Sequence, residues 1–191
     1  MITRDQSQAD AGVRFLAEAG QALAASLDWE QTLVQVAKLA VPTLADWCIV
    51  DVLEDDGITI KQIAVAAADP SKEDLLREMR LLYTPTLESP QPAAQALRSG
   101  EPAVFADFDP DSLRETTRDA RHFEFMQQLD PRSAVAVPLV ARKRMIGTLT
   151  LASGRRTRGK YTFVTRALFE TRLALARPTA LAKYVQGSNA E

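Results

Sequence analysis

The chain has 191 residues, 46% of them hydrophobic, and a net charge of −2. This length and composition are typical of one globular domain and exclude an intrinsically disordered chain. The near-neutral charge gives no reason to expect binding to nucleic acid or to a membrane surface. The single cysteine, Cys48, excludes an internal disulfide framework and a multi-cysteine zinc site.

The N-terminal segment is predicted to be helical after a polar, disordered start over residues 1–10. Apolar residues recur at helical spacing over residues 13–27. Asp28 followed by Gln31 is a helix-start pattern, so a second helix is expected over residues 29–42. The first ten residues lack the apolar core of a signal peptide, and no apolar run is long enough to span a bilayer. We therefore expect a cytoplasmic protein, unless the chain was cut from a larger membrane-anchored one.

A first β-hairpin is predicted over Trp47–Leu53 and Ile58–Ala67, which flank an acidic turn with a glycine. Asp51 is unusual, because a carboxylate within an apolar strand must be solvated, paired or turned toward a polar cavity. Two interpretations stay open: Asp51 is exposed at a strand end, or it faces inward. If it faces inward, Arg80 and Arg121 are the candidate partners.

The segment 70–129 is predicted to be mainly helical. Asp69-Pro70-Ser71 should open a helix that runs to about Leu82. The expected elements after it are a proline-rich irregular stretch at 84–92, a short helix at 93–97 that stops at Gly100, a short strand at 103–106, and an interrupted helical region from Asp109-Pro110 to about Leu129.

A second hairpin is predicted from two apolar runs, 133–140 and 145–151, joined by a short basic turn. Both runs are apolar at nearly every position, so the hairpin should be central in its sheet and covered on both faces. Gly147, inside the second strand, is expected to mark a close backbone approach, and Pro138 should lie near a strand end or a bulge.

The C-terminal part is predicted to contain a basic loop and a long helix. The loop, 154–160, is interpreted as a solvated loop, because it has neither the spacing of a P-loop nor interleaved aromatic residues. The helix is expected over residues 162–185 with an interruption at Pro178. One domain over residues 11–186 would then be followed by a disordered end at 187–191.

The ordered set Ser133, Val137-Pro138-Leu139 and Ile146-Gly147-x-Leu149-x-Leu151 resembles the signature hairpin of GAF domains, which are small ligand-binding and dimerising modules. Leu44–Asp51 is similar to the first strand of GAF domains in bacterial multidomain sensors and phosphatase regulators. The resemblance implies an α+β fold with a central antiparallel sheet of about five or six strands. It also implies that the terminal helices, 13–41 and 162–185, share one face and that the segment 70–129 covers the other.

A ligand pocket is expected between the sheet and the covering segment. Thr148 and Thr150 share one face of their strand, and their hydroxyl groups could contact a ligand there. The candidate pocket residues are Asp51, Ser133, Thr148 and Thr150 as a polar wall and Phe105, Phe123 and Met126 as an apolar lid. Two alternatives remain: the aromatic residues fill an ordinary core, or a one-residue register shift turns Cys48, Val50 and Val52 toward the lid.

Catalytic chemistry finds little support in the sequence. Cys48 is interpreted as a buried, inert thiol, and one cysteine cannot perform the multi-cysteine chemistry of the free-methionine-sulfoxide reductases that share the GAF fold. His122 is weighed as a haem ligand and as a structural histidine, and the structural role is favoured. There is no motif for a metal, a kinase, an activated serine or the cyclic-nucleotide-binding GAF domains.

The expected function is therefore a non-catalytic regulatory domain that binds an unknown small molecule or relays a signal. The relay would pass through a homodimer formed by the terminal helices to an attached or separate output domain, such as a kinase, cyclase or phosphatase. The alternative is a structural dimerisation module with a filled core and no ligand.

Overall fold

The computed structural model describes residues 4–25, 28–141 and 144–154. Five strands within these residues form one antiparallel sheet in the order β2-β1-β5-β4-β3. Their bounds are β1 (Trp47–Leu53), β2 (Ile60–Ala67), β3 (Ala103–Phe105), β4 (Ser133–Ala141) and β5 (Arg144–Ser153). The predicted α+β fold with an antiparallel sheet of five or six strands is confirmed.

The central hairpin joins β4 to β5, with Ser133 opposite Ser153 and Ala141 opposite Arg144. β5 is the middle strand of the sheet, as the unbroken apolar run predicted. Pro138 lies beyond the last β4 residue that pairs with β3 and one residue before a register shift at Leu139/Val140. The proline, which has no N–H to donate, therefore sits beside a bulge and not in the middle of a full ladder.

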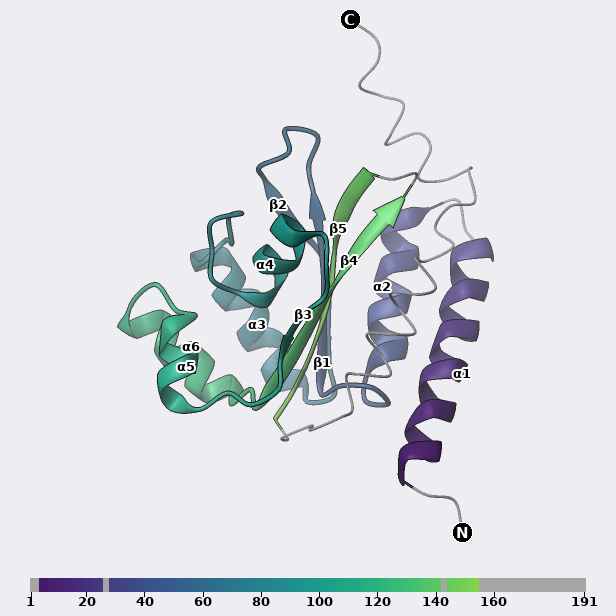
Figure 1. Cartoon of the computed structure of the whole chain (residues 1–191), viewed down its shortest axis with the longest axis horizontal. Helices are drawn as coiled ribbons and strands as arrows, with labels where there is room; N and C mark the ends of the chain where they lie inside the picture. Colours follow the sequence, from purple (N-terminus) through teal and green to yellow (C-terminus); the bar gives the residue numbers. More distant parts are fainter. Residues whose placement is uncertain (1–3, 26–27, 142–143, 155–191) are drawn as a thin grey trace, which may run out of the picture.

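Helices cover both faces of the sheet (Figure 1). One face carries α2 (Trp29–Ala40), with α1 (Arg4–Ala25) packed on its outer side. The opposite face carries α3 (Pro70–Leu82), α4 (Pro92–Ser99), α5 (Pro110–Glu115) and α6 (Ala120–Leu129). The two-sided cover predicted from the sequence is confirmed for the helices that the structure describes. None of these helices is long and apolar enough to cross a membrane.

Strand alternation divides β1 between two cores. Cys48, Val50 and Val52 pack with residues of α1 and α2 in one apolar cluster. Trp47 belongs to the second cluster, on the face of α3 and α6, and Asp51 shares that face because successive side chains alternate across a strand. The reversed register considered for this strand is therefore wrong.

Aspartates define the starts of four helices, because a carboxylate satisfies backbone N–H groups that have no partner within the helix. Asp28, Asp69, Asp109 and Asp119 each accept a hydrogen bond from a backbone N–H of the first turn, at 2.7 to 3.0 Å. Gly100 closes α4 in the left-handed conformation, with φ of 69°. The predicted starts at Asp28, Asp69 and Asp109 and the predicted stop at Gly100 are confirmed.

Two predicted boundaries are corrected. The first helix begins at Arg4, so residues 4–10 are helical and not part of a disordered start. The second strand begins at Ile60, and Ile58 lies in the preceding turn with an exposed side chain. The rest of the basic loop, the final helix at 162–185, Pro178 and the end at 187–191 lie outside the described residues.

Candidate functional site

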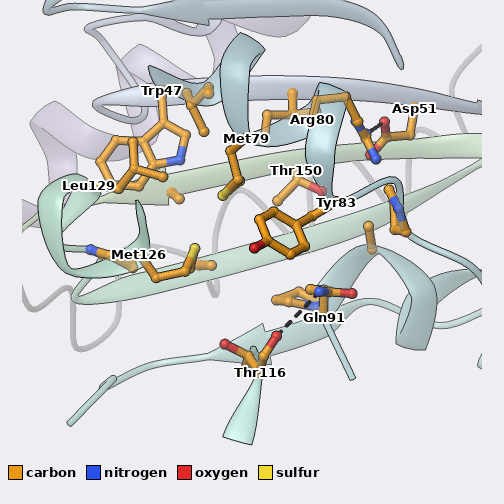
Figure 2. Close-up of a pocket in the computed structure, with 18 of the residues that line it drawn as sticks. Trp47, Asp51, Met79, Arg80, Tyr83, Gln91, Thr116, Met126, Leu129 and Thr150 are labelled. Atoms are coloured by element: carbon orange, nitrogen blue, oxygen red, sulfur yellow. Dashed lines mark hydrogen bonds and ion pairs between the residues drawn. The ribbon is translucent and has the colours of Figure 1, made fainter. Parts of the chain in front are cut away.

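A cavity of about 120 Å³ lies between the sheet and the helices α3, α4 and α6. The sheet contributes Trp47, Ile49 and Asp51 from β1, Gln62 from β2, Ala134 from β4, and Thr150 and Ala152 from β5. The main contributors opposite are Leu76, Met79 and Arg80 of α3, Tyr83, Pro85 and Gln91 of the connection to α4, and His122, Met126 and Leu129 of α6. Figure 2 shows these side chains arranged around the cavity.

Asp51 and Arg80 form a buried ion pair at one side of the cavity (Figure 2). The Asp51 side chain is 4% exposed and the Arg80 side chain 16%. Burial lowers the pKa of Arg80 to about 10, so the guanidinium is still charged at neutral pH. Of the two arginines proposed as partners, Arg80 is the one that pairs, whereas the Arg121 guanidinium lies 5.9 Å from the centre of the Phe125 ring.

Two polar atoms at the cavity have no hydrogen-bond partner among the described residues: Thr150 Oγ1 and Gln91 Oε1. Both atoms are buried. The Gln91 amide is held in place because its Nε2 donates to the carbonyl oxygen of Thr116 at 3.2 Å. Buried polar groups normally have partners, so these two atoms indicate a site where a ligand or water completes the hydrogen bonding.

The connection between α3 and α4 forms one wall of the cavity and is fixed by two arginines, one in α4 and one in the turn between α5 and α6. Arg98 donates to the carbonyl oxygens of Leu87 and Ser89. Arg118 donates to the carbonyl oxygen of Thr84 and to Ser89 Oγ. Side-chain hydrogen bonds thus hold a segment that has no regular secondary structure of its own.

His122 lines the cavity with its ring stacked on Tyr83, at 4.4 Å between ring centroids and 9° between ring planes. Its Nδ1 accepts a hydrogen bond from the backbone N–H of Arg118, so the proton of the neutral ring is on Nε2. Burial is the largest influence on the pKa of His122 and lowers it. The nearby Asp119 carboxylate raises this pKa and the Arg118 guanidinium lowers it further.

We expect the free energy of unfolding to fall as the pH is lowered from about 7 to 5.5. The unfolded chain then binds a proton at histidine, with a pKa of about 6.5, more readily than the folded chain does. The slope cannot exceed about 1.4 kcal/mol per pH unit, because one proton is involved. Urea unfolding at several pH values measures it.

His122→Gln is the control for this prediction, because His122 is the only histidine of the chain. The variant should show a nearly flat dependence over the same pH interval. Equal slopes in both proteins, or a wild type that becomes more stable on acidification, would contradict the assignment.

The residues proposed from the sequence are only partly brought together. Asp51, Thr150 and Met126 line the cavity. Thr148, opposite Asp51 on the same face, is buried without lining it, and its hydroxyl has no partner within the described residues. In the pairing of β4 with β5, Pro138 lies opposite Thr148, so the even-numbered residues of β4 share the face of Thr148. Ser133 is an odd-numbered residue and therefore lies on the opposite face of the sheet.

The predicted aromatic lid is different in the structure. Phe123 is buried in the second apolar cluster, with the Arg114 guanidinium 4.1 Å from its ring centre, and does not line the cavity. Phe105 also stays outside the lining and stacks on Phe108, which lines the cavity, with 5.3 Å between the ring centroids.

The sequence interpretation missed Trp47 and Ile49, although they share the period-two face of Asp51. It also missed Tyr83 and Gln91, which lie in an irregular segment without periodic pattern.

Comparison with known proteins identifies the family. The family model of the GAF domain matches residues 28–177. The chain therefore belongs to the GAF domain family. The comparison with curated proteins returned no match.

Several solved structures share this fold. The GAF domain from a phosphoenolpyruvate-protein phosphotransferase of Coxiella burnetii is 16% identical, with a TM-score of 0.64, and the match covers 92% of this chain and 96% of that chain. The free methionine-R-sulfoxide reductase of Neisseria meningitidis, in complex with its substrate, is 15% identical, with a TM-score of 0.61 and coverage of 88% and 92%. The phycocyanobilin-bound GAF domain of a cyanobacterial phytochrome is 13% identical, with a TM-score of 0.53 and coverage of 92% and 96%.

Proposed function

We propose that this chain is a non-catalytic, regulatory GAF domain that binds a small molecule in the cavity between the sheet and α3, α4 and α6. The observation that carries the proposal is the pair of buried, unpartnered polar atoms at this cavity, Thr150 Oγ1 and Gln91 Oε1. A cavity with apolar walls and a few polar groups is the usual form of a small-molecule site. The bound state would act on an attached or separate output domain of a bacterial signalling protein in the cytoplasm.

The environment of Cys48 supports a non-catalytic role. Its side chain is fully buried on the face of α1 and α2, opposite the cavity. Burial raises the pKa of the thiol far above its ordinary value, so that the reactive thiolate does not form at neutral pH. The polar residues that do line the cavity, Gln91 and Thr150 among them, are suited to hold a ligand by hydrogen bonds.

A route from the cavity to the C-terminal part of the chain passes through Asp46. Its Oδ2 accepts hydrogen bonds from Ser153 Oγ and from the backbone N–H of Gly154, both at 2.8 Å. Trp47, the next residue, lines the cavity, as does Ala152. A ligand that moves Trp47 would therefore act directly on the contacts that hold the end of β5, from which the chain leads toward its C-terminus.

A cavity-filling variant tests ligand binding. Ala152→Leu places a larger side chain in the cavity, whereas Ala67→Leu enlarges a partly buried residue of the same sheet face that does not line it. We expect a metabolite library to contain a compound that raises the melting temperature of the wild type and of Ala67→Leu, but not of Ala152→Leu. Native mass spectrometry of the purified wild type should show that the protein retains the same compound.

The alternative function, a structural dimerisation module without a ligand, predicts a different result. No compound would then stabilise the wild type selectively, and Ala152→Leu would keep any signalling output. Two of the similar structures are GAF domains from larger proteins, a phosphotransferase and a phytochrome, which supports an attached output domain here.

The relay is proposed to use a homodimer formed by the terminal helices. α1 packs on the outer side of α2, and its Val13 side chain is 59% exposed. Isologous pairing is the commonest way to cover such a surface.

Sedimentation velocity at high micromolar concentration should give a dimer for the wild type and a monomer for Val13→Arg. The control Ile58→Arg, at a residue 66% exposed in the β1–β2 turn, should remain dimeric. A monomeric wild type would contradict the dimer.

A further inference from the structure

The size and walls of the cavity restrict the ligand that it can hold. A cavity of about 150 Å³ holds one benzene molecule in a protein core, and this cavity is about 120 Å³. Its walls include the rings of Trp47 and Tyr83 and the thioethers of Met79 and Met126 (Figure 2). Aromatic rings and methionine sulfur atoms both pack favourably on a flat ring. A single ring therefore fits these walls better than a long or branched molecule.

The charge of the cavity favours a neutral ligand. Among the described residues that line it, only Asp51 and Arg80 carry full charges, and these two compensate each other in an ion pair. The other titratable side chains of the lining, His122 and Tyr83, are neutral at pH 7.5, because burial lowers the pKa of the imidazole and raises the pKa of the phenol. A charged ligand would bury its charge without a counter-charge, which is strongly unfavourable in a low-dielectric site.

The unpartnered atoms define the polar part of the ligand. Gln91 Oε1 can only accept a hydrogen bond, whereas Thr150 Oγ1 can donate or accept one. A ligand must therefore present an N–H or O–H group to Gln91, and the same or a second group can bond Thr150. A hydrocarbon of the same shape would leave both protein atoms without partners.

We propose that the cavity binds a neutral, single-ring aromatic or heteroaromatic molecule that carries an N–H or O–H hydrogen-bond donor. This inference rests on the proposed function, because it names the ligand class of the same cavity. Gln91 and Thr150 would select for the donor, and the compensated Asp51–Arg80 pair would select against ionised analogues.

Three probes of similar size test the inference at pH 7.5: phenol, toluene and benzoate. Phenol is neutral and carries a donor, toluene matches its shape without a donor, and benzoate carries a negative charge. NMR titration gives each dissociation constant. We expect phenol to bind about tenfold more tightly than toluene, as one satisfied buried hydrogen bond predicts, and benzoate to bind more weakly than either.

Two variants and a control locate the effect. Thr150→Val and Gln91→Met should each reduce the preference for phenol over toluene severalfold. Thr148→Val is the matched control, because Thr148 lies on the same strand and face with an unpartnered hydroxyl but does not line the cavity. It should leave the preference unchanged. Circular dichroism and melting curves establish that each variant is folded.

Each remaining outcome overturns the inference. Equal binding of phenol and toluene removes the donor requirement, and benzoate binding at least as tightly as phenol removes the requirement for neutrality. If no probe binds, the ligand class is wrong. The proposed function is then judged separately by the metabolite screen with Ala152→Leu: a charged or larger metabolite that binds there would preserve the regulatory function while the ligand class fails.

Discussion

Gly147→Ala is expected to lower the free energy of unfolding by at least about 3 kcal/mol, at the upper end of overpacking substitutions in a protein core. A Cβ atom at this position would overlap the carbonyl oxygen of Asp51 and lie 2.9 Å from Cα of Val52. Both contacts are with the backbone of β1, so no side-chain rotation can relieve them. Strands β1 and β5 would have to separate where Asp51 reaches the cavity. Urea denaturation measures the loss.

Gly20→Ala is the control for this prediction. Gly20 lies within α1, and a Cβ atom there would meet nothing within 4 Å. Alanine should stabilise the helix by about 0.5–1 kcal/mol. A Gly147→Ala protein as stable as the wild type would show that β1 and β5 do not approach each other as closely as described.

Asp51→Asn is expected to cost about 3 kcal/mol of stability, as the removal of one partner from a buried ion pair does. The substitution leaves the Arg80 guanidinium mostly buried without a compensating charge. Adding Arg80→Met should recover part of the loss, since no unpaired charge then remains. Denaturation of the two single variants and the double variant gives the coupling between the side chains.

Asp55→Asn provides the matched control, because it makes the same chemical change just after the end of β1. Asp55 pairs with Arg144 at 3.3 Å, and both side chains are about half exposed. Exposed pairs contribute little, so the loss should stay below about 1 kcal/mol. If both substitutions cost the same, the Asp51–Arg80 pair has no special weight in the fold.

The central hairpin could be predicted from the sequence because two long apolar runs flank a short basic turn. The role of Gly147 followed from its place inside a strand, and the close approach to Asp51 and Val52 is the reason for a glycine there. The helix starts at Asp28 and Asp69 were also predictable, because capping depends on a few adjacent residues. Local patterns thus accounted for the helices and strands, whereas the arrangement of the helices on the two faces of the sheet was implied by the resemblance to GAF domains.

The candidate site was harder to predict, because it depends on how separate elements meet. Ser133 was assigned to the wrong face: both faces of β4 are apolar, so its sequence does not fix which alternate residues face the cavity. The choice between Arg80 and Arg121 depends on the orientation of two helices from different parts of the segment 70–129. Gln91 lies in an irregular connection, where no periodicity assigns a side chain to a face.

The most direct test of the cavity as a ligand site uses methionine methyl groups. Met79 and Met126 line the cavity, whereas Met145 does not line it and lies beside Gly100, the residue that closes α4. The protein is labelled with ¹³C at the methionine methyl carbons and titrated with a compound that stabilises the wild type. We predict that the signals of Met79 and Met126 shift with the same dissociation constant and that the Met145 signal does not move. A bound compound that shifts Met145 and leaves Met79 and Met126 unchanged would contradict the account.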